Sequence, residues 1–200
     1  DGVRGHYIVD RLHKLIRERR LTKSLIDQLI EARSLEFSSW PPKNKEALIE
    51  YIYGTSAVPN LLLLEIIGNQ TGLEKKATDL GMAWGLTNLI RAFPSMARQN
   101  RSPLPIDLLT GDQNFTEFDS DLGRAIEAIY CLAKEYLDKS RAAKIRSGRE
   151  YRSVFLSSIL NKYYLNQITQ SGYNPYTLNM RTGRVYRQFI TGIGALFRTY

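Results

Sequence analysis

Apolar side chains recur at intervals of three and four residues along most of the chain, which is the spacing of amphipathic helices. The first stripe predicts a helix over about residues 4–19. A second stripe predicts a helix that begins after Thr22, which can act as its N-cap, and ends near Ser38. Pro41 and Pro42 follow and prevent any continuation of that helix.

The middle of the chain predicts the helices of the core. One helix starts near residue 43 with an exposed half and continues into a wholly apolar half, with a bend at Pro59. The next helix spans about residues 73–93 and ends at Pro94. The segment Ser95–Asp121 has little periodicity, and a loop of that length inside a compact domain is usually functional.

Three further apolar stripes predict the C-terminal helices. The first begins at Leu122 and runs into a basic stretch near Ser147, and the second is centred on residues 154–163. A turn separates these from the last helix, over about residues 185–196. No run alternates apolar and polar residues for long enough to predict a strand. We therefore expect an all-α protein with six or seven helices in a single domain, residues 1–200.

The composition narrows the class of protein. With 43% hydrophobic and 24% charged residues, the chain is a globular protein and disorder is excluded as its main state. Its lone cysteine, Cys131, excludes a disulfide framework and a cysteine-ligated zinc site, and we expect it in the core. The most apolar run, Val58–Ile67, has about half of the ~20 residues that a spanning helix needs, so no transmembrane helix is expected.

The charge is strongly basic. A formal net charge of +8 favours an acidic partner, such as anionic lipid, nucleic acid, a diphosphate or an acidic protein face. The basic residues are spread along the chain, so a solvated surface explains most of them. The charge alone does not choose among these partners.

Two sets of side chains have the spacing of metal ligands but are interpreted as solvated faces. His6, Asp10 and His13 share one helical face, as in a site with two histidines and one carboxylate, yet no further ligand is near. Glu46 and Glu50 are carboxylates one turn apart on a polar face. Asp119 and Asp121 are interpreted as capping the helix that begins at Leu122. Gly192 and Gly194 follow no strand, so they do not indicate a nucleotide-binding site. We therefore predict no metal site.

The segment Leu80–Leu109, LGMAWGLTNLIRAFPSMARQNRSPLPIDLL, resembles the signature of the squalene/phytoene synthase family. In that family a helix reading G-x-A-x-x-L-T-N-I-L-R-D is followed by a basic loop and Y-L-P-x-D. The matching residues are Gly81, Ala83, Leu86, Thr87, Asn88, Leu89, Arg91, Arg101, Leu104, Pro105 and Asp107. Similar segments extend the resemblance over the chain: Ile30–Phe37, Tyr51–Gly68 and Tyr163–Thr177. The resemblance implies an isoprenoid-synthase-type helical bundle.

The resemblance also implies a specific loss. Family members hold Mg²⁺ with two aspartate-rich motifs, each with two carboxylates four residues apart. Ala92 and Met96 stand where the second motif has its aspartates, and neither side chain offers an oxygen to Mg²⁺. The first motif would precede Asp1, because the chain resembles the later two-thirds of the family domain and is therefore expected to be an N-terminally truncated form of it. Diphosphate ionisation needs metal charge at the leaving group, so we expect a pseudoenzyme without metal or cofactor.

The former substrate pocket is expected in reduced form between the helices around Tyr51–Gly68 and Leu80–Phe93, filled by side chains or by a lipid tail. Its polar remnant comprises Tyr51, Thr55, Asn88, Arg91 and Arg101. Truncation is also expected to uncover the apolar run Val58–Leu64 and the facing side of the helix that follows, so that an obligate partner covers them.

Two functions follow from the resemblance. The stretch Tyr51–Gly68 and the R-A-F-P sequence after the second motif are similar to the family's mitochondrial group that includes a respiratory complex I assembly factor. This implies a noncatalytic assembly factor or structural subunit of a respiratory complex, the ATP synthase or the mitoribosome. Its place would be the matrix or the matrix face of the inner membrane, with protein subunits as partners and basic patches that contact anionic lipid or RNA. The alternative is an active Mg-dependent prenyl-diphosphate synthase of the squalene/phytoene type.

Overall fold

The computed structural model describes residues 5–38, 40–68, 72–109, 115, 117–143, 149–178 and 184–197. Within these ranges it has no strand, so the all-α prediction is confirmed. The α-helices are α1 (Tyr7–Arg19), α2 (Lys23–Ser38), α3 (Lys45–Ile52), α4 (Val58–Ile67), α5 (Glu74–Ala97), α6 (Ser120–Ala142), α7 (Arg152–Phe155), α8 (Ser157–Gln170) and α9 (Arg184–Phe197). Four short elements complete it: the π-helix η1 (Tyr53–Ala57) and the 3₁₀-helices η2 (Ile106–Leu108), η3 (Arg149–Tyr151) and η4 (Pro175–Thr177).

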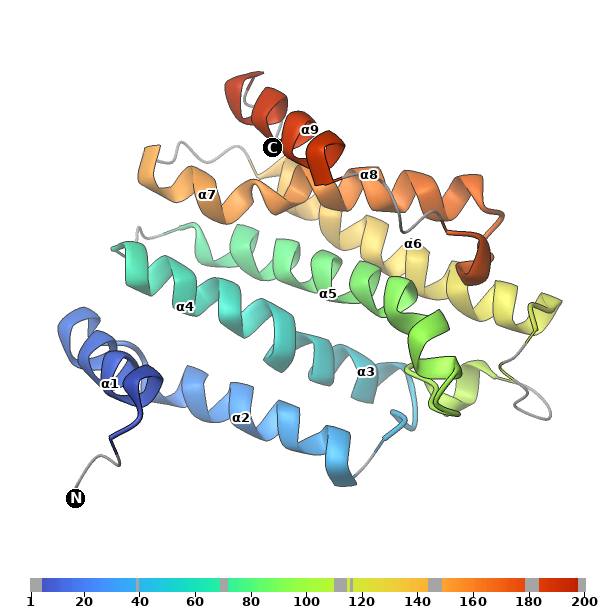
Figure 1. Cartoon of the computed structure of the whole chain (residues 1–200), viewed down its shortest axis with the longest axis horizontal. Coiled ribbons are helices and arrows are strands. Elements are labelled where there is room, and N and C mark those ends of the chain that lie inside the picture. Colours follow the sequence, from blue (N-terminus) through green and yellow to red (C-terminus); the bar gives the residue numbers. More distant parts are fainter. Residues whose placement is uncertain are drawn as a thin grey trace.

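Helix α5 lies at the centre of the molecule, with α3 and α4 on one side and α6 and α8 on the other (Figure 1). It is buried on nearly all sides, and Leu80, Leu86, Ile90 and Phe93 are fully enclosed. A helix that is buried on nearly all sides belongs to the core, and one core cluster extends from α3 to α8. The single domain over residues 1–200 stays a prediction.

Helices α3, η1 and α4 form one continuous helix with a π-helical turn in the middle. In that turn the Val58 amide donates to the Tyr53 carbonyl, five residues back. The sequence predicted one helix here with a bend at Pro59. The irregularity lies instead in η1, just before Pro59, where the π-helical turn interrupts the regular α-helical hydrogen-bond pattern.

This continuous helix, Lys45–Ile67, is called the bulged helix below. It and α5 approach each other closely at two glycines of α5. A Cβ atom on Gly81 would lie 2.5 Å from Cα of Ala57, and one on Gly85 would lie 2.5 Å from Oγ of Ser56. Any larger side chain would therefore push the two helices apart. The close approach places the polar residues of η1 directly against α5.

Helix α5 continues beyond its predicted end. It passes through Pro94 and ends at Ala97, because Phe93 and Ala97 are both buried and hold the backbone in place. A proline inside a helix costs about 3 kcal/mol, and burial of the flanking side chains offsets that cost. The irregular segment is correspondingly shorter than predicted.

Three local predictions have different outcomes. Asp119 caps α6 as predicted, its carboxylate accepting a hydrogen bond from the Leu122 amide at 2.7 Å. Thr22 instead ties the start of α2 to α4, because its hydroxyl donates to Glu65 at 2.6 Å and its amide donates to the same carboxylate at 2.8 Å. The prediction for Cys131 is wrong: it is exposed, on the outer side of α6. The predicted helix end near Ser147 lies outside the described residues.

The predicted uncovered face is also wrong. Val58 and Leu64 are only 0% and 1% exposed, because α2 and α5 pack over α4. Leu63 alone in that run is exposed, at 38%. Large exposed apolar side chains lie instead on α1, α2 and α9.

One helix has the dimensions of a membrane span. The continuous stretch Lys45–Ile67 is 23 residues long and apolar enough to cross a membrane by length and composition alone. The sequence argument considered only its second half. In the fold, Leu48, Ile52 and Leu64 of this helix are buried in the protein core.

The close approach makes a prediction about stability. The substitution Gly81→Ala places a methyl group against the backbone of Ala57, which cannot move aside as a side chain can, so we expect a loss of about 1–3 kcal/mol. Gly192→Ala is the matched control: its Cβ would meet nothing within 4 Å, and removal of a helical glycine should stabilise the protein by up to about 1 kcal/mol. Urea unfolding measures both, and equal stability of the two variants would contradict the close approach.

Candidate functional site

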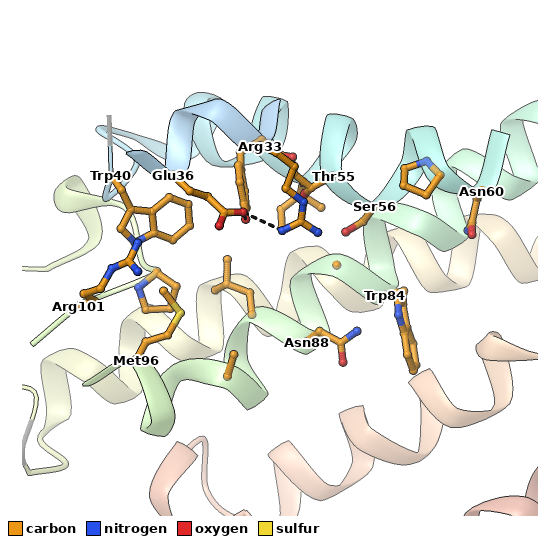
Figure 2. A pocket seen from close by; sticks show the side chains of 17 residues that line it. Arg33, Glu36, Trp40, Thr55, Ser56, Asn60, Trp84, Asn88, Met96 and Arg101 are labelled. Carbon is orange, nitrogen blue, oxygen red and sulfur yellow. Dashed lines mark hydrogen bonds and ion pairs between the residues drawn. The ribbon is translucent and has the colours of Figure 1, made fainter. Parts of the chain in front are cut away.

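A pocket of about 560 Å³ lies between α2, the bulged helix and α5 (Figure 2). One side carries charged and aromatic groups and the other carries the face of α5. The residues that line it are Arg33, Glu36, Trp40, Tyr51, Ile52, Thr55, Ser56, Pro59, Asn60, Trp84, Gly85, Asn88, Leu89, Ala92, Met96, Arg101 and Pro103.

The charged side is organised around Glu36. Arg33, one turn earlier on α2, donates from Nη1 to Oε1 of Glu36 at 2.7 Å. The Tyr51 hydroxyl donates to the same oxygen at 2.7 Å, so a residue of α3 ties the two helices together. The Trp40 ring meets the Tyr51 ring edge to face at a centroid distance of 4.9 Å and closes this end.

The ionisation of these groups follows from their contacts. Burial raises the pKa of Tyr51 to about 12, and the hydrogen bond to the Glu36 carboxylate and its charge add to the rise. Burial alone would raise the pKa of Glu36. The hydrogen bonds from Tyr51 and Arg33, with the charges of Arg33 and Arg101, outweigh it and hold that pKa below its ordinary value. Glu36 is therefore an anion at neutral pH that is already bound by two donors.

The α5 wall is built from residues four apart. Trp84, Asn88, Ala92 and Met96 follow one another at helical spacing and all line the pocket (Figure 2). Across from them, the Thr55 hydroxyl donates to the Tyr51 carbonyl at 2.8 Å. Ala92 and Met96 thus face the cavity at the positions where the resemblance places metal-binding aspartates.

Arg91 lies apart from the four other residues predicted with it. Tyr51, Thr55, Asn88 and Arg101 line the pocket, whereas the Arg91 guanidinium stacks 3.6 Å from the centre of the Tyr164 ring. It lines a second cavity, of about 660 Å³, between α5, α8 and α9. Burial lowers the pKa of Arg91. A hydrogen bond from Arg91 Nη1 to Oδ1 of Asn88, at 2.7 Å, links it to the pocket.

Several pocket residues were absent from the predicted set. Ser56 and Asn60 are polar residues four apart in an otherwise apolar stretch, and that spacing was a signal available in the sequence. The Asn60 side chain also donates to the Ala77 carbonyl at 3.2 Å. Trp40 reaches the pocket from a loop and Trp84 from α5, and neither position had a distinguishing pattern.

The carboxylates of the described residues do not cluster. No group of three or more His, Cys, Asp or Glu side chains there could hold a metal ion. His6, Asp10 and His13 are all exposed, as are Glu46 and Glu50. Glu36 is the one carboxylate that lines the described pocket.

Solved structures show which fold this is. The chain superimposes on a dehydrosqualene synthase with a TM-score of 0.74 and 17% identity, covering 90% of this chain and 67% of that one. It superimposes on a squalene synthase from Alicyclobacillus acidocaldarius with a TM-score of 0.75 and 18% identity, covering 84% of this chain and 66% of that one. The fold is therefore that of isoprenoid-synthase-type proteins.

The family model described as squalene/phytoene synthase matches residues 1–190, and the chain belongs to this family. Two curated relatives are named "NADH dehydrogenase (ubiquinone) complex I, assembly factor 6 homolog". The Drosophila melanogaster protein is 24% identical over 178 residues, which are 83% of this chain and 52% of that protein. The Dictyostelium discoideum protein is 24% identical over 174 residues, 82% of this chain and 49% of that protein. The chain thus spans about half the length of these relatives.

The Glu36 cluster makes a prediction about pH. Because Glu36 has a lowered pKa, its contribution to stability is present above its unfolded-state pKa and is lost as the pH falls through the folded-state pKa. Tyr51→Phe removes one donor and should destabilise the protein by about 1 kcal/mol at neutral pH. The difference from wild type should shrink as the pH falls below about 4.

Urea unfolding at several pH values measures this difference. Tyr53→Phe is the control, since within the described ranges the Tyr53 hydroxyl has no hydrogen bond, and it should leave stability unchanged at every pH. A Tyr51→Phe effect that is the same at acid and neutral pH would show that its cause is packing and not the carboxylate.

Proposed function

We propose that the protein is a noncatalytic member of its family that acts in the assembly of mitochondrial respiratory complex I. The proposed loss of catalysis rests mainly on the α5 wall, where Ala92 and Met96 face the pocket at the positions of the family's metal-binding aspartates. The groups at the polar side, Tyr51, Thr55 and Arg101, are the remnant of a substrate pocket, together with Asn88.

The chemistry of the pocket supports this proposal. Mg²⁺ in such sites is held by one or two carboxylates together with substrate phosphates. Glu36 is the sole carboxylate among the lining residues, and Arg33 and Tyr51 both donate to it. A cation there would have to displace the Arg33 guanidinium, and the α5 wall opposite offers a methyl group and a thioether. The described lining residues of this chain offer no second carboxylate with which to hold a metal at a departing diphosphate.

The proposed place and partners come from the relatives. Both are named for complex I assembly, and a squalene synthase-like fold whose described pocket is lined by a single carboxylate suits a binding role better than a reaction. We propose that this chain acts in mitochondria, at the matrix side of the inner membrane, with subunits of complex I as partners. A role in the ATP synthase or the mitoribosome is an alternative outcome of the second experiment below.

Catalytic inactivity is tested directly. Incubated with Mg²⁺ and farnesyl or geranylgeranyl diphosphate, the protein should release no pyrophosphate above a buffer blank, because Ala92 and Met96 offer no oxygen to a metal and Glu36 is already bound by Arg33 and Tyr51. An active squalene synthase assayed in parallel is the positive control. Release that disappears on addition of a chelator would restore the enzyme and defeat the proposal.

The assembly role is tested in cells that lack the protein. Native gel electrophoresis of their mitochondria should show loss of assembled complex I, with complex III and the ATP synthase at normal levels, and reintroduced wild-type protein should restore complex I. Normal complex I, or an earlier loss of the ATP synthase or of mitochondrial translation, would contradict the proposed partner.

A further inference from the structure

Helix α1 is the least covered of the long helices. None of its residues is buried, and only Leu15 and Ile16 are half-buried. Tyr7, Ile8 and Leu12 are 71%, 65% and 45% exposed. The helix packs against α4 through its C-terminal half and lies at an outer edge of the molecule (Figure 1).

The apolar residues of α1 form one continuous arc. Ile8, Leu12 and Leu15 are four and three residues apart, and Val9 and Ile16 extend the same side. The arc is covered by the protein only at its C-terminal end, so its N-terminal half faces solvent. Scattered apolar residues at a surface need no explanation, but a contiguous arc on one helix marks a contact with an apolar environment.

The same helix carries an excess of positive charge. Between Tyr7 and Arg20 there are five cations and two acids, a net charge of +3. One acid, Glu18, is paired with Lys14 at 3.6 Å. Arg11, Arg17 and the remaining cations are exposed, and the Arg11 guanidinium lies 5.1 Å from the centre of the Tyr7 ring.

We propose that α1 docks on the surface of an anionic phospholipid membrane. A helix with an apolar arc, exposed cations beside it and low overall hydrophobicity lies in the plane of the bilayer interface, its arc among the acyl chains and its cations at the phosphates. The charge indicates which partner binds. The apolar arc would fit any apolar surface, but exposed arginines along the helix complement a layer of negatively charged headgroups.

Helix α9 gives a comparison within the same molecule. It also exposes large apolar side chains, Tyr186, Phe189 and Ile193, at 49%, 62% and 39%. Its Arg187, however, points inward and donates to the Tyr164 hydroxyl at 3.4 Å. Among the α9 side chains that the structure describes, residues 186–193, this inward-turned arginine is the sole cation, so Phe189 provides the matched control position.

Vesicle cosedimentation tests the proposal on the full chain. Binding to phosphatidylcholine vesicles that contain phosphatidylglycerol should be about tenfold or more tighter than binding to phosphatidylcholine alone, and should weaken as salt is added. Ile8→Ser with Leu12→Ser should lower binding about tenfold or more, and Arg11→Glu with Arg19→Glu, which are exposed on the arc's side of the helix, should do the same. Phe189→Ser should bind as wild type does. Circular dichroism melts confirm that each variant is folded.

A fluorescent label locates the contact. In a Cys131→Ser background, which removes the exposed native thiol, an environment-sensitive dye on Leu12→Cys should shift to the blue on anionic vesicles, and the same dye on Phe189→Cys should not. Wild-type binding by the Ile8 and Leu12 variant, or a shift only at position 189, would overturn the proposal. So would no vesicle binding, or a dimer that the Ile8 and Leu12 substitutions dissolve.

The proposal goes beyond the assembly function and does not depend on it. Vesicle binding uses purified protein and lipid alone, whereas the assembly role is measured by complex I in cells. A protein that restores complex I but ignores vesicles contradicts only the membrane contact, and the reverse result contradicts only the proposed partner.

Discussion

The close approach of α5 to the bulged helix is the constraint on which the rest of the structure depends. Gly81 and Gly85 present no side chain, so α5 lies against the backbone of Ala57 and the side chain of Ser56. At that separation the α5 face that carries Asn88 stands directly across from the turn that carries Thr55. The pocket is therefore formed by the packing of the helices.

Periodicity predicted nearly all the helices. Each helix buries one stripe of apolar residues, and the spacing of those residues along the sequence shows the stripe directly. What it missed depends on contacts between distant segments. The continuation of α5 beyond Pro94 needs the burial of Phe93 and Ala97, and the π-helical turn arises where the chain meets the glycines of α5. The apolar run from Val58 is covered because α2 folds over it, which no local pattern indicates.

The pocket could be predicted in part for the same reason. Positions four apart on one helix share a face, and Asn88, Ala92 and Met96 all line the pocket. Arg91 is one residue from Ala92 and so points about 100° away, into the second cavity. The ionisation of Glu36 could not be predicted at all, since it depends on the Tyr51 hydroxyl from another helix.

The central proposal is that this pocket has lost the metal chemistry of the family. Ala92, Met96 and Glu36 line it, and Arg33 and Tyr51 already donate hydrogen bonds to Glu36. The most direct measurement is calorimetric titration with a non-ionisable thiodiphosphate analogue of farnesyl diphosphate, with and without Mg²⁺. The account predicts that Mg²⁺ leaves the affinity unchanged, because Ala92 and Met96 offer no oxygen to a metal and Arg33 and Tyr51 already donate to Glu36. A marked tightening by Mg²⁺ that a chelator reverses would contradict it.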